Sequence, residues 1–214
     1  MIKFYTVSGG GRLTSCVGIC LWLLEELQIN YEIISLDLYN AEHKSEEFLK
    51  LNPNGKIPCI DDNGFLLWES VAINYHLARK YSPELLGNTL EEKALIDQWT
   101  LWMISEFQPL VTTIFRNASL PKEQKDHGLV QKSKYKIMQC TLLLENELSK
   151  RKNIVGNKFT MADINIAAIA SIHKIIKTDL TEYPNFSRWL NVMLSRKSLY
   201  SLQQKKLIVI KLDD

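Results

Sequence analysis

The stretch LNPNGKIPCIDDNGFLLWES, residues 51–70, decides the fold. Two apolar, strand-like runs flank an Asn-Gly pair, and Asn-Gly between such runs is a strong hairpin signal. We therefore expect a strand over 57–60, a turn over 61–64 and a second strand over 65–68. Helical spacing of apolar residues resumes at Ser70, so the hairpin leads directly into a helix.

Two dipeptides in this stretch each allow two interpretations. Because proline has no backbone N–H, Pro58 must stand at a strand start or edge. The Ile57-Pro58 bond is then either an ordinary edge proline or a cis peptide that turns the Ile57 N–H and C=O toward a bound, extended peptide. Glu69-Ser70, at the junction of strand and helix, either caps the helix or holds the ammonium and carboxylate of a free amino-acid head.

The residues before this stretch predict a βαβ unit. Residues 2–7 alternate apolar and polar side chains, which is typical of a strand, and residues 31–36 (YEIISL) are expected to form a second strand. Residues 16–27, which lie between them, have helical spacing. A strand, a helix and a second strand in this order favour two parallel strands. The charged stretch 40–52 is expected to be a loop that leads into a short helix.

After the hairpin and its helix, the pattern is helical almost throughout. We expect a small βαβ–ββα domain over residues 1–80, a linker over 81–90 and an all-helical domain over 91–214. Within the second domain, apolar spacing predicts helices over 161–178 and 186–194. The last residues, LIVIKLDD, are expected to form a short extended tail, for which the sequence suggests no function.

Composition excludes several classes of protein. With 46% hydrophobic residues, 23% charged residues and a net charge of +2, the 214-residue chain has no basic stripe for nucleic acid and no polybasic patch for a membrane. It shows no apolar run long enough to cross a bilayer and no signal peptide. No Cys-x-x-Cys pair or zinc spacing occurs, so we expect no metal site. We expect the four cysteines, Cys16, Cys20, Cys59 and Cys140, to be reduced and the protein therefore to be cytoplasmic.

Two hydroxyls and a thiol stand where the first helix should begin. Thr14, Ser15 and Cys16 follow a run of three glycines. A hydroxyl at this position can cap the helix by accepting a backbone N–H. It can also donate a hydrogen bond to an anion that the helix N-terminus attracts. The sequence leaves both roles open.

Four motifs carry a family resemblance. In chain order they are LNPNGKIPCI, DDNGFLLWESVAINYHLARKY, VGNKFTMADI and YPNFSRWLNVML. Together they resemble the cytosolic glutathione transferase family, with a theta- or delta-like or bacterial-type N-terminal domain. The resemblance covers essentially the whole chain. It implies a thioredoxin-like N-terminal domain that binds glutathione, an all-helical C-terminal domain that shapes a pocket for a small apolar electrophile, and a homodimer with neither nucleic acid nor membrane as partner.

The resemblance also assigns glutathione-binding residues. The backbone of Ile57 beside Pro58 would pair with the cysteinyl part of glutathione, and Glu69 with Ser70 would hold the γ-glutamyl head. Candidates for the glycine carboxylate are His43, Lys44 and Lys56. A solvated loop explains His43 and Lys44 equally well.

The conjugation that the resemblance implies needs a hydrogen-bond donor for the glutathione sulfur. Glutathione attacks as the thiolate, but a free thiol has a pKa of about 8.5, so a donor is needed to favour the anion at neutral pH. Thr14 falls where theta- and delta-like enzymes keep a catalytic serine, Ser15 where some bacterial and fungal relatives do, and Cys16 where beta-class enzymes keep a cysteine. Gly18 replaces the arginine of the theta-like pattern. Tyr5 is a rival donor, although its place inside a strand favours a packing role.

Three functions therefore remain open. The first is a transferase that conjugates the glutathione thiolate to apolar electrophiles. The second is a glutathione-dependent thiol–disulfide oxidoreductase that uses Cys16. The third is a non-catalytic binding or regulatory protein with the same fold.

Thr160 and Asp163, spaced as in a capping box, are expected to be structural. Aromatic and apolar residues that could face the electrophile, or pack in the core, are Trp102, Phe107, Ile114 and Phe115.

Overall fold

The computed structural model describes residues 1–8 and 11–209. Its contacts divide the chain into two compact units, Met1–Leu86 with Ser195–Asp214 and Gly87–Leu194. The sequence assigned the residues after 194 to the helical domain, whereas residues 197–204 pack on the first helix of the N-terminal unit. Within the described residues, no helix is long and apolar enough to cross a membrane.

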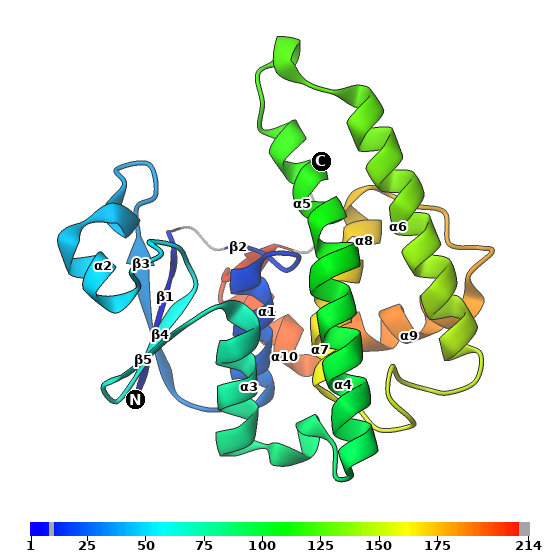
Figure 1. The fold of residues 1–214 in the computed structure, drawn as a ribbon, viewed down its shortest axis with the longest axis horizontal. Coiled ribbons are helices and arrows are strands. Elements are labelled where there is room, and N and C mark those ends of the chain that lie inside the picture. The colour runs from blue at the N-terminus through cyan, green and yellow to red at the C-terminus, as the bar shows by residue number, and fades with distance from the viewer. Residues whose placement is uncertain (9–10, 210–214) are drawn as a thin grey trace. The chain divides into compact units, whose positions relative to one another are not determined.

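A four-stranded mixed sheet forms the centre of the first unit (Figure 1). The strands are β1 (Ile2–Val7), β3 (Tyr31–Leu36), β4 (Cys59–Asp62) and β5 (Phe65–Trp68), and their order across the sheet is β3-β1-β4-β5. β1 and β3 run parallel, β4 runs antiparallel to β1, and β5 runs antiparallel to β4. This arrangement confirms the expected βαβ–ββα domain with a thioredoxin-like fold.

The hairpin is displaced from its predicted position. The sequence placed a strand at 57–60 and the turn at 61–64, whereas β4 includes Asp61 and Asp62 and the turn contains only Asn63 and Gly64. Both turn residues have positive φ, 55° and 95°, as a tight two-residue hairpin requires. The strand can include these two acidic residues because both carboxylates accept hydrogen bonds. Asp61 accepts the Gly64 N–H at 2.6 Å, and the buried Asp62 accepts from two side chains of the following helix.

Helices cover both faces of the sheet. α1 (Cys16–Glu26) and α3 (Ser70–Tyr81) lie on one face, and the short α2 (Glu46–Leu51) lies on the other (Figure 1). Eight consecutive residues of α1, 17–24, are buried, so this helix is enclosed on all sides rather than amphipathic. Phe48 of α2 packs against Tyr5 of β1, with ring centroids 5.9 Å apart.

The chain returns to the first unit at its C-terminal end. α10 (Lys197–Gln204) packs on α1, and β6 (Ile208–Val209) pairs in parallel with β2 (Gly11–Arg12), just before α1. Part of the expected extended tail is therefore a strand in a second, two-stranded sheet. Residues 210–214 of that tail, and Gly9 and Gly10 of the glycine run, lie outside the described residues.

The second unit is helical, as expected. Its helices are α4 (Leu90–Trp102), α5 (Gln108–Ala118), α6 (His127–Leu148), α7 (Met161–Ala170), α8 (Ile172–Ile175) and α9 (Pro184–Leu194). Every residue of α7 is buried, so this helix forms the core of the unit. The helix predicted over 161–178 is interrupted at Ser171, whose hydroxyl donates to the Ala168 carbonyl at 2.6 Å, a contact that bends helices.

The acidic residue of the predicted capping box has a purely structural environment. The Asp163 carboxylate is fully buried and accepts the backbone N–H and the hydroxyl of Thr160 at 2.9 and 3.1 Å. It also accepts the Ile154 N–H at 3.0 Å and the Trp189 indole N–H at 2.9 Å. Burial raises the pKa of Asp163, and these donors act in the opposite direction. One side chain thus joins the start of α7, the loop before it and α9.

Candidate active site

The strand directions bring four segments to one edge of the sheet. Cys59, the first residue of β4, lies between Tyr5 of β1 and Trp68, the last residue of β5. β3 ends beside the end of β1, because the two strands are parallel and in register. The segments after β1, after β3, before β4 and after β5 therefore leave the sheet at the same edge. All ten candidate residues lie in these four segments.

The segment before β4 contains a cis peptide bond between Ile57 and Pro58. Pro58 is buried and Ile57 is partly exposed. The bond therefore has the cis form, one of the two forms that the sequence allowed. Asn52, which sequence reasoning missed, supports the segment. Its buried amide donates to the Lys56 carbonyl at 2.6 Å and accepts the Asn54 N–H at 3.0 Å.

The segment after β3 is tied to the same loop. Lys44, in a 3₁₀ turn over Glu42–Lys44, donates from Nζ to the Gly55 carbonyl at 2.7 Å. Gly55 has a φ of +57°, and a Cβ there would lie 2.8 Å from the Lys44 Nζ and 3.0 Å from the His43 carbonyl. A glycine is therefore required for this close approach. His43 and Lys44 lie beside the loop that carries the exposed Lys56.

His43 differs from an ordinary solvated loop residue. Its Nδ1 is buried and has no hydrogen-bond partner among the described residues. A buried polar atom without a partner is uncommon in a folded protein and calls for an explanation, such as a ligand or a water molecule. The Lys44 ammonium, in contrast, has one bond to Gly55 and retains donors for another acceptor.

The segment after β5 has an unusual backbone. Glu69 has φ +71° and ψ 115°, a conformation that non-glycine residues rarely adopt and that often marks functional sites. Glu69 occupies the N-cap position of α3 without a side-chain capping bond, and its side chain is exposed. Ser70 is the first helical residue, so the capping role suggested for it is wrong. The Ser70 carbonyl accepts from the Cys20 thiol at 3.3 Å, which links α3 to α1.

The three residues at the start of α1 have different roles in the structure. Ser15 is the N-cap: its hydroxyl accepts the Gly18 N–H at 3.1 Å and donates to the Arg12 carbonyl at 2.6 Å. Both functions of this hydroxyl are therefore already used. The Thr14 side chain is 6% exposed, and no hydrogen bond joins its hydroxyl to another described residue. Cys16 is the first residue of the helix and is half-buried.

The other cysteines and Tyr5 behave as packing residues. Burial, followed by the effect of Cys16, raises the pKa of the Cys20 thiol well above its usual value. Burial also raises the pKa of Cys59 and of Cys140 to about 11. Such thiols stay protonated at neutral pH and are poor nucleophiles. The Tyr5 ring packs against α2, and burial raises the pKa of its phenol.

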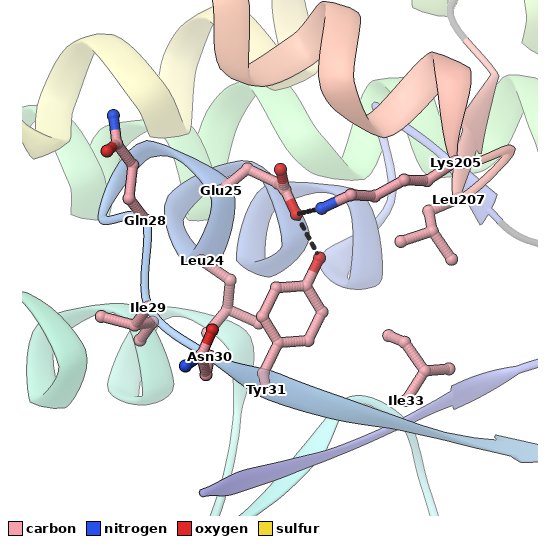
Figure 2. Close-up of a pocket in the computed structure, with 9 residues that line it drawn as sticks. All are labelled: Leu24, Glu25, Gln28, Ile29, Asn30, Tyr31, Ile33, Lys205 and Leu207. Carbon is pink, nitrogen blue, oxygen red and sulfur yellow. Dashed lines mark hydrogen bonds and ion pairs between the residues drawn. The ribbon is translucent and has the colours of Figure 1, made fainter.

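Each unit also has a cavity of its own. One of about 460 Å³ lies at the far end of β3 from the four segments (Figure 2). On its wall, Glu25 accepts from the Tyr31 hydroxyl at 2.6 Å and from the Lys205 ammonium at 2.5 Å. The cavity of the helical unit, about 480 Å³, is lined in part by Trp102 and Cys140.

The candidate residues for the electrophile differ in exposure. Phe107 is fully buried and Ile114 is 8% exposed, so both pack in the core of the helical unit. Trp102 and Phe115 are half-buried. In the described part of the chain, no group of three or more histidine, cysteine or acidic side chains is arranged to hold a metal ion.

Comparison with known proteins bears on both units. Residues 11–79 match the family described as Glutathione S-transferase, N-terminal domain, and residues 107–197 match Glutathione S-transferase, C-terminal domain. Glutathione S-transferase F12 of Arabidopsis thaliana is 33% identical over 225 residues, covering 98% of this chain and 98% of the relative. Probable glutathione S-transferase GSTF2 of rice, Oryza sativa subsp. japonica, is 29% identical over 207 residues, covering 92% and 93%.

Solved structures agree with this comparison. Glutathione transferase F2 from Populus trichocarpa has a TM-score of 0.83 at 26% identity, and the match covers 96% of this chain and 99% of that one. Glutathione S-transferase-I bound with lactoylglutathione has a TM-score of 0.81 at 30% identity, with coverage of 96% and 98%. The chain therefore belongs to the glutathione S-transferase family, and the relatives named here are plant phi-class proteins rather than the theta- or delta-like ones that the sequence suggested.

Proposed function

We propose that this protein binds glutathione at the edge of the sheet where the four segments meet, and transfers the glutathione thiolate to apolar electrophiles. The convergence of these segments is the observation that carries the proposal. Glutathione is an extended tripeptide with a charged group at each end, and the four segments offer backbone, acidic and basic groups on one side of the unit. Glutathione S-transferase-I, 30% identical, was solved with a glutathione derivative bound.

Each part of glutathione has a matching group. The partly exposed Ile57, beside the cis bond, supports pairing of its backbone with the cysteinyl residue. Glu69, exposed at the start of α3, would bind the γ-glutamyl ammonium, and Ser70 with the free N–H groups of the helix would bind its carboxylate. At the other end, the glycine carboxylate would meet the Lys44 ammonium and His43, whose Nδ1 lacks a partner among the described residues. Lys56 adds a further positive charge on the same loop.

Thr14 is the residue that we assign to the thiol. Its hydroxyl is not bonded to another described residue, whereas the Ser15 hydroxyl caps α1. A hydroxyl donor and a helix N-terminus both stabilise a thiolate relative to a thiol. They therefore lower the pKa of the bound glutathione thiol, so that a larger fraction attacks at neutral pH.

Calorimetry tests the binding site. We expect glutathione to bind the wild type in the micromolar to millimolar range, and the Glu69→Ala, Ser70→Ala double variant to lose measurable binding. Glu84→Ala, an exposed acidic residue of the same unit outside the four segments, serves as the control. Absence of binding by the wild type would contradict both enzymatic functions and favour the non-catalytic alternative.

Kinetics separates the three residues at the start of α1. With a generic aromatic halide, Thr14→Val is expected to lower kcat about 10- to 100-fold, the effect of losing a hydrogen bond to a charged group. Thr14→Ser should keep most of the activity. Ser15→Ala should mainly lower stability, by about 1 kcal/mol, because it removes the cap. If Ser15→Ala abolishes turnover and Thr14→Val does not, the assignment is wrong.

The oxidoreductase alternative makes a different prediction. It requires a mixed disulfide between Cys16 and glutathione, with oxidised glutathione or a disulfide substrate as the oxidant. Mass spectrometry would detect this adduct, and Cys16→Ser would lose disulfide reduction while keeping conjugation. We also propose a homodimer and a cytoplasmic location, and sedimentation velocity and fractionation test them.

A further inference from the structure

The loop that carries Thr14 is held by the end of the chain. Gly11 and Arg12 form β2, which pairs in parallel with Ile208 and Val209 of β6. The Gly11 N–H donates to the Leu207 carbonyl at 3.1 Å. Ile208 is 4% exposed, so β6 is anchored by a buried side chain, whereas Arg12 of β2 is exposed.

The same loop is fixed on its other side by α1. A Cβ on Gly18 would lie 2.4 Å from the Arg12 carbonyl oxygen and 2.6 Å from the Leu13 Cα, so the backbone of the loop lies directly against the first turn of the helix. The Arg12 carbonyl accepts both the N–H and the hydroxyl of Ser15, at 3.0 and 2.6 Å. Arg12 therefore connects the strand pairing to the helix cap, and Thr14 lies between these two fixed points.

The segment that ends in β6 is itself anchored. We call residues 196–209 the C-terminal arm. Arg196 forms an ion pair with Glu26, whose carboxylate also accepts the Ser198 hydroxyl at 2.6 Å. Glu25 accepts the Ser201 hydroxyl at 2.7 Å.

The arm continues in a fixed direction after α10. Lys205 donates to Glu25 at 2.5 Å, as Figure 2 shows. The helix ends with a positive φ of 56° at Lys206, and the Leu207 N–H bonds back to the Leu202 carbonyl at 2.9 Å. These contacts run along α1 from its last turn and direct the arm toward the loop before its first turn.

We infer that the C-terminal arm is a positioning element of the active site, in which β6 holds the Gly11–Arg12 strand so that the Thr14 hydroxyl is aimed at the glutathione sulfur. This inference rests on the proposed function of Thr14. It gives the otherwise unexplained C-terminal residues a role in thiol activation. The segments proposed to hold the rest of glutathione, at 43–44, 56–58 and 69–70, have no part in this pairing.

Two truncations test the inference. One chain ends after Lys206 and lacks β6; the matched control ends after Val209 and keeps it. The readouts are kcat, the KM for glutathione and the pKa of bound glutathione, titrated through the ultraviolet absorbance of its thiolate. Without β6, we expect the pKa of the bound thiol to rise by about one unit and kcat to fall about tenfold, with KM changed less than about threefold. The control should behave as the wild type.

A second pair of variants leaves the C-terminus intact, in case the short chain is unstable. Gly11→Pro removes the N–H that bonds Leu207, whereas Gly11→Ala keeps it and adds a Cβ in ordinary contact, 3.4 Å from the Ser15 Oγ. Gly11→Pro should reproduce the rise in thiol pKa, and Gly11→Ala should not. Combining Gly11→Pro with the loss of β6 should add little, because both changes remove one interaction.

The outcomes separate this inference from the proposed function. If the wild type lowers the thiol pKa and Thr14→Val abolishes that effect, the proposed function stands. An unchanged thiol pKa in the chain without β6, or an equal defect in the control truncation, would then overturn the inference alone. A purely structural arm would lower the melting temperature without moving the thiol pKa, which also contradicts it.

Discussion

Asp163→Ala should be among the most destabilising single substitutions in the helical unit. The change leaves four buried donors without their acceptor, which are the N–H groups of Ile154 and Thr160, the Thr160 hydroxyl and the indole N–H of Trp189. Each such donor costs about 1–3 kcal/mol. Relaxation and the removal of a buried charge offset part of this sum. We expect a loss of about 4 kcal/mol in the free energy of unfolding, within the range for breaking a buried charged contact.

Two further variants calibrate this number. Asp163→Asn keeps the oxygen that serves Ile154 and Trp189 but presents an amide group to the Thr160 N–H, so about half the loss is expected. Asp126→Ala removes the cap of α6, where one carboxylate oxygen accepts the Leu129 N–H at 2.8 Å in an exposed position. Losing such a cap costs about 1 kcal/mol.

Urea unfolding, followed by far-ultraviolet circular dichroism, measures the free energy of unfolding of all three variants. The slope of this free energy against urea concentration is compared with that of the wild type, to check that only the midpoint changes. The order of destabilisation should be Asp163→Ala, then Asp163→Asn, then Asp126→Ala. Glutathione binding should remain in every variant that is folded. If Asp163→Ala costs no more than Asp126→Ala, the reasoning from buried unsatisfied donors is refuted.

Three other predictions follow from buried or crowded positions. Burial lowers the pKa of His173 to about 4, so the neutral imidazole stabilises the fold above pH 6.5. This contribution, at most about 3 kcal/mol, should be lost as the pH falls from 6.5 toward 4. His173→Gln should therefore make the urea midpoint depend less on pH. Gly55→Ala should lower the melting temperature and weaken glutathione binding, because its Cβ meets the His43 carbonyl; Gly64→Ala, with φ +95° and open space, should lower only the melting temperature. Gly18→Ala should lower both the melting temperature and kcat, and an unchanged kcat would show that the loop does not need this close contact.

Much of the fold could be predicted because local patterns agree with tertiary packing. The alternation in residues 2–7 agrees with the burial of Ile2, Phe4 and Thr6 on one face of β1. The hairpin was misplaced by two residues because Asp61 and Asp62 are poor strand formers whose bonds come from Gly64 and from α3, and no local pattern reports those bonds.

Interruptions in helices were harder to predict. The turn of wider π-helical geometry at Met103–Phe107 precedes Pro109, whose missing N–H breaks the regular helical bonding, yet the sequence around it reads as continuous helix. At Ser171, whose hydroxyl donates to the Ala168 carbonyl, neither glycine nor proline marks the break between α7 and α8. At both interruptions, backbone conformations of similar energy compete, and tertiary packing determines which one forms.

For the site, the sequence could predict which residue types are present but not which role each residue has. Spacing could not distinguish Thr14 from Ser15, because either can cap a helix; only the bonds of Ser15 to Gly18 and Arg12 separate them. Asn52 and the arm were missed for a different reason. Their partners lie in loops or about 200 residues away, so periodicity contains no signal for them.

The pairing of β2 with β6 also has a consequence for synthesis. A ribosome makes Arg12 about 200 residues before Val209, with which it pairs. At roughly 5–20 residues per second, about 10–40 seconds pass before the second strand exists. During that time the sheet and α1 can form, but the loop before α1 lacks the strand that fixes it. A chain that has not yet reached β6 can therefore fold most of its N-terminal unit while the loop that carries Thr14 is not yet fixed, and the inference above predicts about tenfold slower turnover for such a chain.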